Sequence, residues 1–210
     1  MKIGVIGAGN VGGTIGRGWA HKGHEVLFGV RDPRDAKVAD LLAESGNKAS
    51  AGSIRQAAAF GDVVALSTPW AAAREAIQMA GDLSGKIVLD CTNPLRSDAS
   101  GLDVGHTTSG GEMVASWAEN ARVVKIFNMT GFGNMADPRY GAEAATMFLC
   151  GNDAEAKDVA SKLAKDLGFD PVDVGALREA RLLEPLAMLW IHLAFVQGMG
   201  TGIAFKLMRR

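Results

Sequence analysis

The chain has 210 residues, of which 48% are hydrophobic, which suffices for one well-buried domain with a small appendage but not for two large domains. The formal net charge of −1 and a pI near 6.4 provide no basic surface for nucleic-acid phosphates, so nucleic acid is not an expected partner. Cys91 and Cys150 are the only cysteines and follow apolar runs, which favours free thiols in a reducing, cytoplasmic setting.

Five apolar runs in the first 130 residues are predicted strands: residues 2–7, 25–29, 62–67, 86–91 and 122–127. Amphipathic stretches between most of them are typical of crossover helices, and continuous Val/Ile/Leu-rich strands are typical of a sheet covered on both faces. The predicted fold class is therefore α/β, a Rossmann-type doubly wound parallel sheet. Because the first strand begins at Lys2, no signal peptide is expected.

Two helices carry clear end signals. Thr68-Pro69 is expected to cap and open a helix over residues 71–80 that Gly81 ends. Asn152 with Glu155 forms a capping-box pattern for a second helix, which Gly168 ends.

The last third of the chain adds two candidate strands and one very apolar segment. Residues 144–150 and 171–174 are predicted to extend the same sheet. Residues 182–196 are apolar almost all round, which predicts burial on several sides. Residues 185–205 carry no charge and have the length of a membrane span, but their polar residues and three glycines favour a core or subunit-interface helix, so no membrane partner and a homodimer are expected. We expect a dinucleotide-binding domain over residues 1–175 and a C-terminal helical segment over residues 176–210.

The strongest functional motif is Gly7-Ala8-Gly9-Asn10-Val11-Gly12, which matches G-x-G-x-x-G directly after the first strand. A helix that begins near Val11 would point its free N–H groups at a pyrophosphate. The strand before the motif, the helix after it and a second strand at residues 25–29 together predict a dinucleotide site.

The end of the second strand indicates which dinucleotide binds. NAD sites place a carboxylate there for the ribose hydroxyls, whereas this chain has Gly29-Val30-Arg31, with Arg34 close behind. Two arginines suit the 2′-phosphate of NADP(H). Solvated arginines, with Asp32 turned toward the ribose, are the alternative.

Further strand ends supply polar groups for the same crevice: Ser67-Thr68-Pro69-Trp70 and Asn93-Pro94. They are candidates to line the ribose and nicotinamide, although Thr-Pro and Asn-Pro also begin ordinary turns. His21 and His24 lack a third ligand, so no metal site is predicted. The loop over residues 98–111, which contains His106, is either a cover for the crevice or a plain surface loop, and Asp90 shows no pairing typical of acid/base catalysis.

These residues resemble the NADP oxidoreductases that depend on the deazaflavin coenzyme F420, together with their bacterial relatives. The resemblance covers nearly the whole chain, through residues 7–12, Val30-Arg31, Thr68-Pro69-Trp70, Phe127-Asn128, Asp173-Val174-Gly175, Arg181-Leu182-Leu183-Glu184, Gly198-Met199-Gly200 and Gly202-Ile203. Archaeal members carry serine where this chain has Val30.

The resemblance implies hydride transfer between NADP(H) and a deazaflavin or flavin-like small-molecule acceptor stacked on the nicotinamide. Residues that would border the acceptor are Asn128, Met129, Thr130, Met199 and Gly200. Such transfer depends on ring alignment, and no catalytic acid or base is predicted. The alternatives are an NADPH-dependent imine reductase, of the pyrroline-carboxylate type, and an NADP sensor without turnover.

Overall fold

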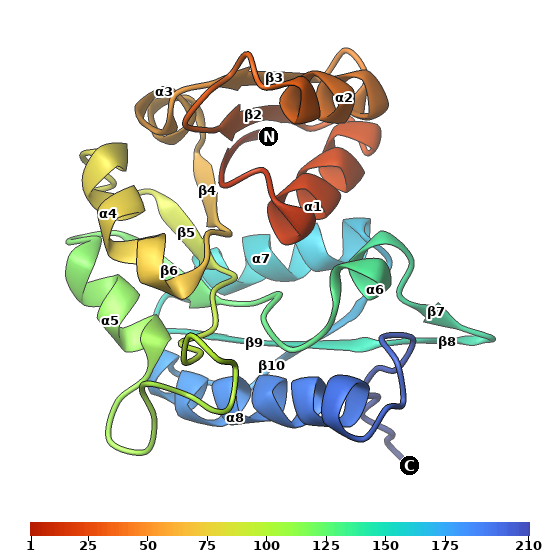
Figure 1. The fold of residues 1–210 in the computed structure, drawn as a ribbon. Coiled ribbons are helices and arrows are strands. Elements are labelled where there is room, and N and C mark those ends of the chain that lie inside the picture. The colour runs from red at the N-terminus through yellow and green to blue at the C-terminus, as the bar shows by residue number, and fades with distance from the viewer.

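The computed structural model describes residues 1–210, and its main element is an eight-stranded sheet in the order β10-β9-β6-β5-β4-β1-β2-β3 (Figure 1). The strands are β1 (Lys2–Ile6), β2 (Glu25–Gly29), β3 (Ala49–Gly52), β4 (Val63–Leu66), β5 (Ile87–Asp90), β6 (Arg122–Lys125), β9 (Thr146–Gly151) and β10 (Asp170–Asp173). All neighbours pair in parallel except β6 and β9, which are antiparallel. The predicted Rossmann-type sheet is confirmed, and the two later strands extend it.

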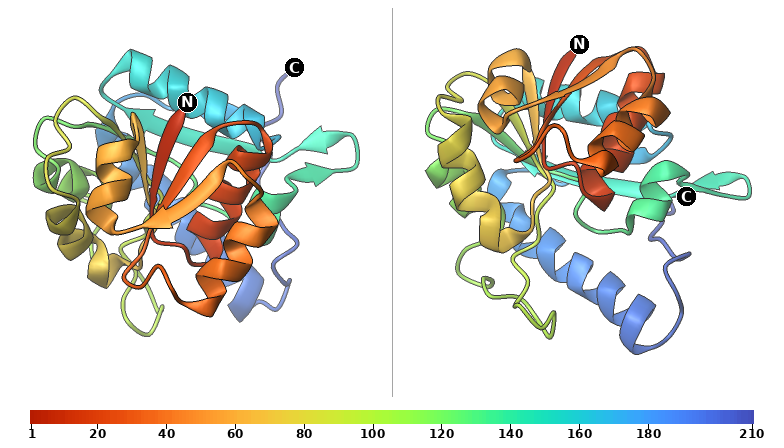
Figure 2. Two further views of the ribbon diagram at one scale, coloured as in Figure 1. Left: turned by 90° about the horizontal axis from the view of Figure 1, so that it is seen from above. Right: turned by 45° about the horizontal axis from the view of Figure 1, so that its top comes forward.

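Helices cover both faces of the sheet (Figure 2). They are α1 (Asn10–His21), α2 (Ala36–Ser45), α3 (Ile54–Phe60), α4 (Trp70–Ala80), α5 (Gly110–Trp117), α6 (Phe132–Ala136), α7 (Ala154–Asp166) and α8 (Ala180–Ile191), with a 3-10 turn at Leu177–Glu179 and a π-helical turn at His192–Val196. A small hairpin, β7 (Arg139–Tyr140) with β8 (Glu143–Ala144), projects from the body.

Successive side chains of a strand point to opposite faces of the sheet, so each face has its own part of the hydrophobic core. Ile3 and Val5 of β1 join a cluster of 29 buried residues that includes Trp19 of α1. Ile6 of β1 joins a second cluster of 15 buried residues that includes Ile77 of α4. The first strand therefore lies between two apolar layers, as its continuous hydrophobic sequence predicts.

Two helix starts differ from the sequence prediction. α4 begins at Trp70 after Pro69, and Thr68 makes no capping hydrogen bond. α7 is capped by Asp153, whose side chain accepts from the N–H of Ala156. Asn152 lies one position too early, and its Oδ1 accepts from the N–H of Leu177 instead.

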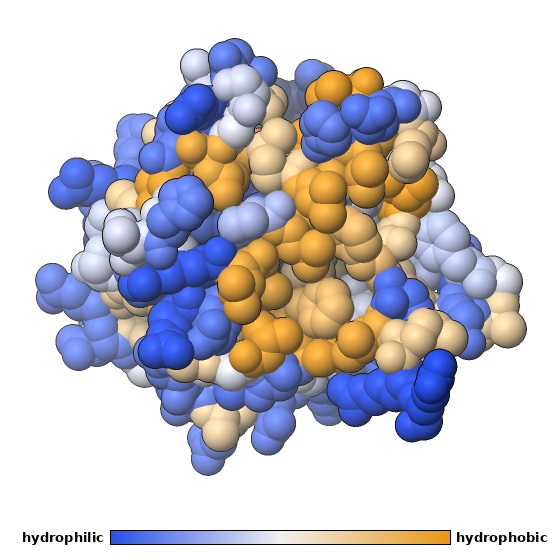
Figure 3. All heavy atoms as spheres, turned by 90° about the horizontal axis from the view of Figure 1, so that it is seen from below, coloured by the Kyte–Doolittle hydropathy of each residue, from blue (hydrophilic) through white to orange (hydrophobic).

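The prediction of burial around residues 182–196 is wrong for one side of this segment. Leu182, Leu189, Phe195 and Val196 are between 47% and 67% exposed. α8 packs on the sheet through Leu183 and Ala187 and leaves an apolar outer face (Figure 3). None of the helices combines the length and the apolar character that crossing a bilayer requires.

Candidate functional site

The glycine loop connects β1 to α1 at the switch point of the sheet, where β1 lies between β2 and β4. Gly7 has φ +97°, a left-handed conformation that favours glycine, and its N–H donates to Gly29 O at 3.1 Å. No side chain caps α1, whose cap residue is Gly9 and whose first turn holds no acidic residue. The first N–H groups of α1 are therefore available to an anion.

The end of β2 brings Arg31 beside this loop, because β1 and β2 pair up to Ile6 and Gly29. Arg31 is exposed and forms no ion pair, whereas Arg34 interacts with Asp32 through an Nε–Oδ1 distance of 3.7 Å. Asp32 Oδ1 also accepts from the Arg34 N–H at 3.0 Å. Asp32, the first acidic residue after β2, thus interacts with its own loop, whereas Arg31 forms no ion pair.

The residues after β4 brace the loop. The Ser67 hydroxyl donates to Ile6 O and Gly7 O at 3.1 and 2.9 Å, so its first role is to hold the glycine turn. Thr68 Oγ1 is buried without a hydrogen-bond partner, and Trp70 packs against Trp117 of α5 with ring centroids 5.3 Å apart.

After β5 and β6 the chain forms a pair of asparagines. Asn93 Nδ2 donates to Asn128 O at 2.7 Å, and Asn128 Nδ2 donates to Asn93 Oδ1 at 3.1 Å and to Leu183 O of α8 at 3.1 Å. Asn128 Oδ1 is buried and unpartnered. The preceding Phe127 has φ +59°, which a bulky side chain rarely adopts and which costs on the order of 1–3 kcal/mol. This bend leads from β6 into the pair, which ties the two strand ends together.

The expected acceptor residues are only partly brought together. Met129 is 1% exposed and lies in the core, so its side chain does not line a pocket, whereas Met199 is 60% exposed. Thr130 Oγ1 and Ile203 O both accept from Asn134 Nδ2, at 2.8 and 2.7 Å. Asn134 therefore holds the segment after β6 against the tail that follows Gly200.

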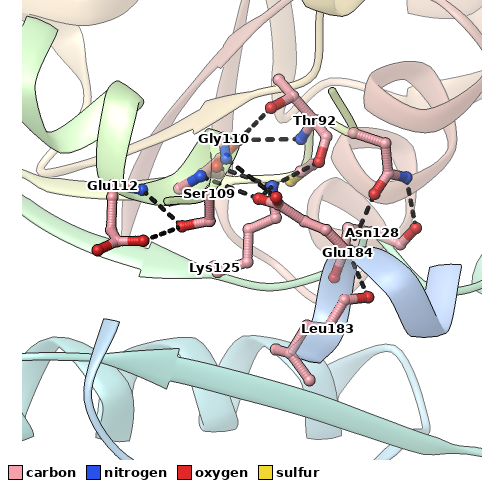
Figure 4. A network of polar contacts seen from close by, with 12 residues as sticks. Thr92, Ser109, Gly110, Glu112, Lys125, Asn128, Leu183 and Glu184 are labelled. Atoms are coloured by element: carbon pink, nitrogen blue, oxygen red, sulfur yellow. Dashed lines mark hydrogen bonds and ion pairs between the residues drawn. The ribbon is translucent and has the colours of Figure 1, made fainter. Parts of the chain in front are cut away.

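A buried ionic cluster next to this region was missed by the sequence prediction. Lys125 Nζ lies 2.9 Å from Asp90 Oδ2 and 3.0 Å from Glu184 Oε1, and all three side chains are at most 1% exposed (Figure 4). Burial disfavours the Lys125 ammonium, but the adjacent charges of Asp90 and Glu184 outweigh it, and the pKa of Lys125 is raised. Removing one partner of such a cluster costs roughly 3–5 kcal/mol because an uncompensated charge stays buried. Asp90 is thus a paired structural carboxylate, which its sequence pattern did not indicate.

Glu184 joins this cluster to α5. Its Oε2 and Oε1 accept from the N–H groups of Gly110 and Gly111, both at 2.9 Å, at the N-terminus of that helix. Ser109, at the end of the 98–111 loop, caps the same helix. Before it, His106 lines an open hollow of about 500 Å³ together with Arg181 and Leu182 of α8, so this part of the loop lies opposite the C-terminal segment.

The two histidines considered as metal ligands have separate structural partners. His21, the last residue of α1, lies 2.9 Å from Glu44 O, and His24 Nε2 lies 3.0 Å from Asp166 Oδ2 of α7. No group of three His, Cys, Asp or Glu side chains lies together in a metal-binding arrangement.

Comparison with known proteins agrees with this geometry. Residues 2–94 match the family described as NADP oxidoreductase coenzyme F420-dependent. The F420-dependent NADP reductase of Methanocaldococcus jannaschii is 30% identical, with 97% of each chain covered. A crystal structure from Arthrobacter sp. FB24, of a candidate F420-dependent NADP reductase, superposes over both whole chains with a TM-score of 0.91 and 34% identity.

A second group of relatives is much longer. The metalloreductase STEAP3 of Rattus norvegicus is 29% identical over 90% of this chain, which spans only 37% of that relative. A reductive aminase from Aspergillus terreus has a TM-score of 0.67 at 21% identity, which indicates a shared fold, and 62% of that enzyme is covered. The full-length matches and the glycine loop place the chain in the family of coenzyme F420-dependent NADP oxidoreductases.

Proposed function

We propose that the protein transfers a hydride between NADP(H) and a deazaflavin or flavin-like acceptor bound over the nicotinamide. The observation that carries the NADP(H) assignment is the uncapped start of α1 beside the unpaired Arg31. A Cβ at Gly9 would meet nothing within 4 Å, so the loop leaves open space where a diphosphate would approach.

Each part of the dinucleotide has candidate residues. The diphosphate would be held by the glycine loop, which consists of Gly7, Ala8, Gly9, Asn10, Val11 and Gly12. The 2′-phosphate would be held by Val30, Arg31 and Arg34. Residues 67–70 with Asn93 and Pro94 would border the ribose and nicotinamide. Bound NADPH supplies the hydride, and the chain's part is to align the nicotinamide with the acceptor and exclude water.

The acceptor would lie between the end of β6 and the C-terminal segment, which we treat as a functional unit over residues 176–210. Asn128, Thr130, Met199 and Gly200 remain candidates to border it, with Met129 contributing through its backbone. Support comes from Asn134, which joins Thr130 to the tail, and from the names of the full-length relatives.

NADPH oxidation by the purified protein tests this proposal, with deazaflavin, FMN, FMN plus a ferric chelate, and a cyclic imine as separate acceptors. We expect turnover with the deazaflavin or FMN, and a strong preference for NADPH over NADH. Turnover with the imine alone would favour an imine reductase, the chemistry named for its more distant structural neighbours. Saturable NADPH binding without turnover on any acceptor would favour a sensor.

We further propose that the protein is cytoplasmic and that two copies associate through the outer face of α8. The support is a strip of exposed apolar residues, Leu182, Leu189, Phe195 and Val196, because large exposed apolar patches mark interaction sites and two-fold dimers are the commonest assemblies. Light scattering should give a dimer for the wild type and a monomer for Leu189→Glu. A monomeric wild-type protein would overturn this proposal.

A further inference from the structure

Two polar layers lie side by side where β5, β6 and α8 meet (Figure 4). The ionic layer consists of Asp90, Lys125 and Glu184. The amide layer consists of Asn93 and Asn128, with Leu183 O as its acceptor on α8. The ionic layer takes one side chain from each of these three elements, whereas the asparagines of the amide layer lie in the segments just after β5 and β6.

The two layers are linked through residues that are adjacent in the sequence. Lys125 Nζ donates to Thr92 O at 2.6 Å, and Thr92 immediately precedes Asn93. On α8, Leu183 immediately precedes Glu184. A shift of either residue of the Lys125–Glu184 pair therefore moves the backbone that fixes the amide layer.

We propose that Lys125 and Glu184 are positioning residues that set the nicotinamide end of the crevice through Asn93 and Asn128. This inference rests on the proposed function, which puts the nicotinamide beside these strand ends. The 2′-phosphate end of the site is built by β2 and α1, and β1, β4 and β5 lie between β2 and β6 in the sheet. Disturbing the pair should therefore affect one half of the dinucleotide and spare the other.

A purely structural anchor predicts something different. If the cluster only fastened α8 to the sheet, a variant would lower stability without distinguishing the two halves of the ligand. Binding of NADPH compared with binding of 2′,5′-ADP, which lacks the nicotinamide, separates the two cases.

Calorimetric titration of Glu184→Gln with both ligands is the test. Gln retains the shape and one of the two oxygens that accept from the Gly110 and Gly111 N–H groups, and it removes the charge that faces Lys125. The expected result is an NADPH affinity about tenfold weaker, the size expected for one lost charge-assisted hydrogen bond, with 2′,5′-ADP affinity unchanged.

Glu112→Gln is the matched control. Glu112 also joins α5 to α8, through Arg181 at 2.7 and 2.8 Å, but it does not contact Lys125. This variant should bind both ligands like the wild type.

Thr92→Val provides a milder change should Glu184→Gln fail to fold. It replaces the hydroxyl that donates to Asp90 Oδ1 at 2.7 Å with a methyl group and keeps the Thr92 carbonyl that accepts from Lys125. The same selective loss of NADPH affinity is expected, at a smaller size. If a folded variant lost affinity for NADPH and 2′,5′-ADP equally, or kept its wild-type affinity for NADPH, the inference would be overturned. Wild-type protein that binds 2′,5′-ADP but not NADPH would overturn it too, and failure to bind either ligand would refute the proposed function itself.

Discussion

The Cβ position of Gly12 lies 2.0 Å from the carbonyl oxygen of Gly7. It also lies 2.2 Å from Ser67 Oγ, so any side chain at residue 12 would collide with the turn and with the hydroxyl that braces it. Gly9 differs, since its Cβ position is open and its φ of −76° is accessible to any residue. The fold requires the glycine at position 12, whereas the glycine at position 9 is required only by the diphosphate of the proposed function.

Paired alanine variants test this division. Gly12→Ala should lower the free energy of unfolding by about 1–3 kcal/mol because the turn must shift. Gly9→Ala should leave stability within about 0.5 kcal/mol but weaken NADPH binding, because its methyl group occupies the space left for the diphosphate. Urea denaturation and calorimetric titration measure both effects. A Gly9→Ala protein with wild-type affinity would contradict the proposed position of the diphosphate.

Arg31→Ala should weaken NADPH binding about tenfold and leave NADH binding unchanged, since only NADPH carries the 2′-phosphate. Arg34→Ala is the comparison, because Arg34 already interacts with Asp32, and its effect should be smaller. Equal losses for NADPH and NADH in Arg31→Ala would mean that this side chain does not recognise the 2′-phosphate.

The Glu112–Arg181 pair predicts an acid-sensitive contact between α5 and α8. Hydrogen bonds from Arg181 hold the pKa of Glu112 below its ordinary value, although partial burial acts in the opposite direction. A lowered folded-state pKa contributes stability above the unfolded pKa, about 4.3, that is lost as pH falls through the folded value. The difference in unfolding free energy between wild type and Glu112→Gln should therefore be constant near neutrality and vanish in acid. A difference that persists at pH 2 would refute this account.

The two thiols should be unreactive in the native protein. Burial raises the pKa of Cys150 to about 12 and that of Cys91 still further, so neither forms appreciable thiolate at pH 8. Ellman's reagent should detect no rapidly reacting thiol in buffer and both thiols in urea. Fast labelling of the folded protein would show that one of these strand ends opens readily.

The glycine loop and its place in the sheet were predictable because their signals are local. Gly7, Gly9 and Gly12 lie within six residues, and the apolar strands on either side place them at the switch point. β3 was missed because its sequence, Ala-Ser-Ala-Gly, shows no apolar alternation. The start of α3 was also missed, although Ser53 and Gln56 form a complete capping box there.

The ionic cluster was not predictable because its members come together only in the fold. Lys125 lies 35 residues from Asp90, and its strand, Arg-Val-Val-Lys, is a short apolar run with a charged residue at each end. A lysine between Val124 and Ile126, both buried, was the available signal, since a charge there needs partners. The exposed side of α8 escaped prediction for a related reason: periodicity shows that a helix is apolar all round, but not how many of its sides one chain covers.

The return of the tail to β9 fixes the order in which the molecule can be completed during synthesis. The Thr146 N–H donates to Phe205 O at 2.9 Å, and Thr146 Oγ1 accepts from the Leu207 N–H at 3.0 Å. The start of β9 therefore gains these hydrogen bonds only after residues about sixty positions later in the chain have been made. Until residues 205–207 leave the ribosome, the backbone N–H of Thr146 at the start of β9 has no partner, and such an unpaired strand edge is prone to aggregation. The glycine loop and its strands come earlier in the chain and can already fold. A nascent chain stalled before residue 205 would therefore have a folded glycine loop while still needing protection from aggregation.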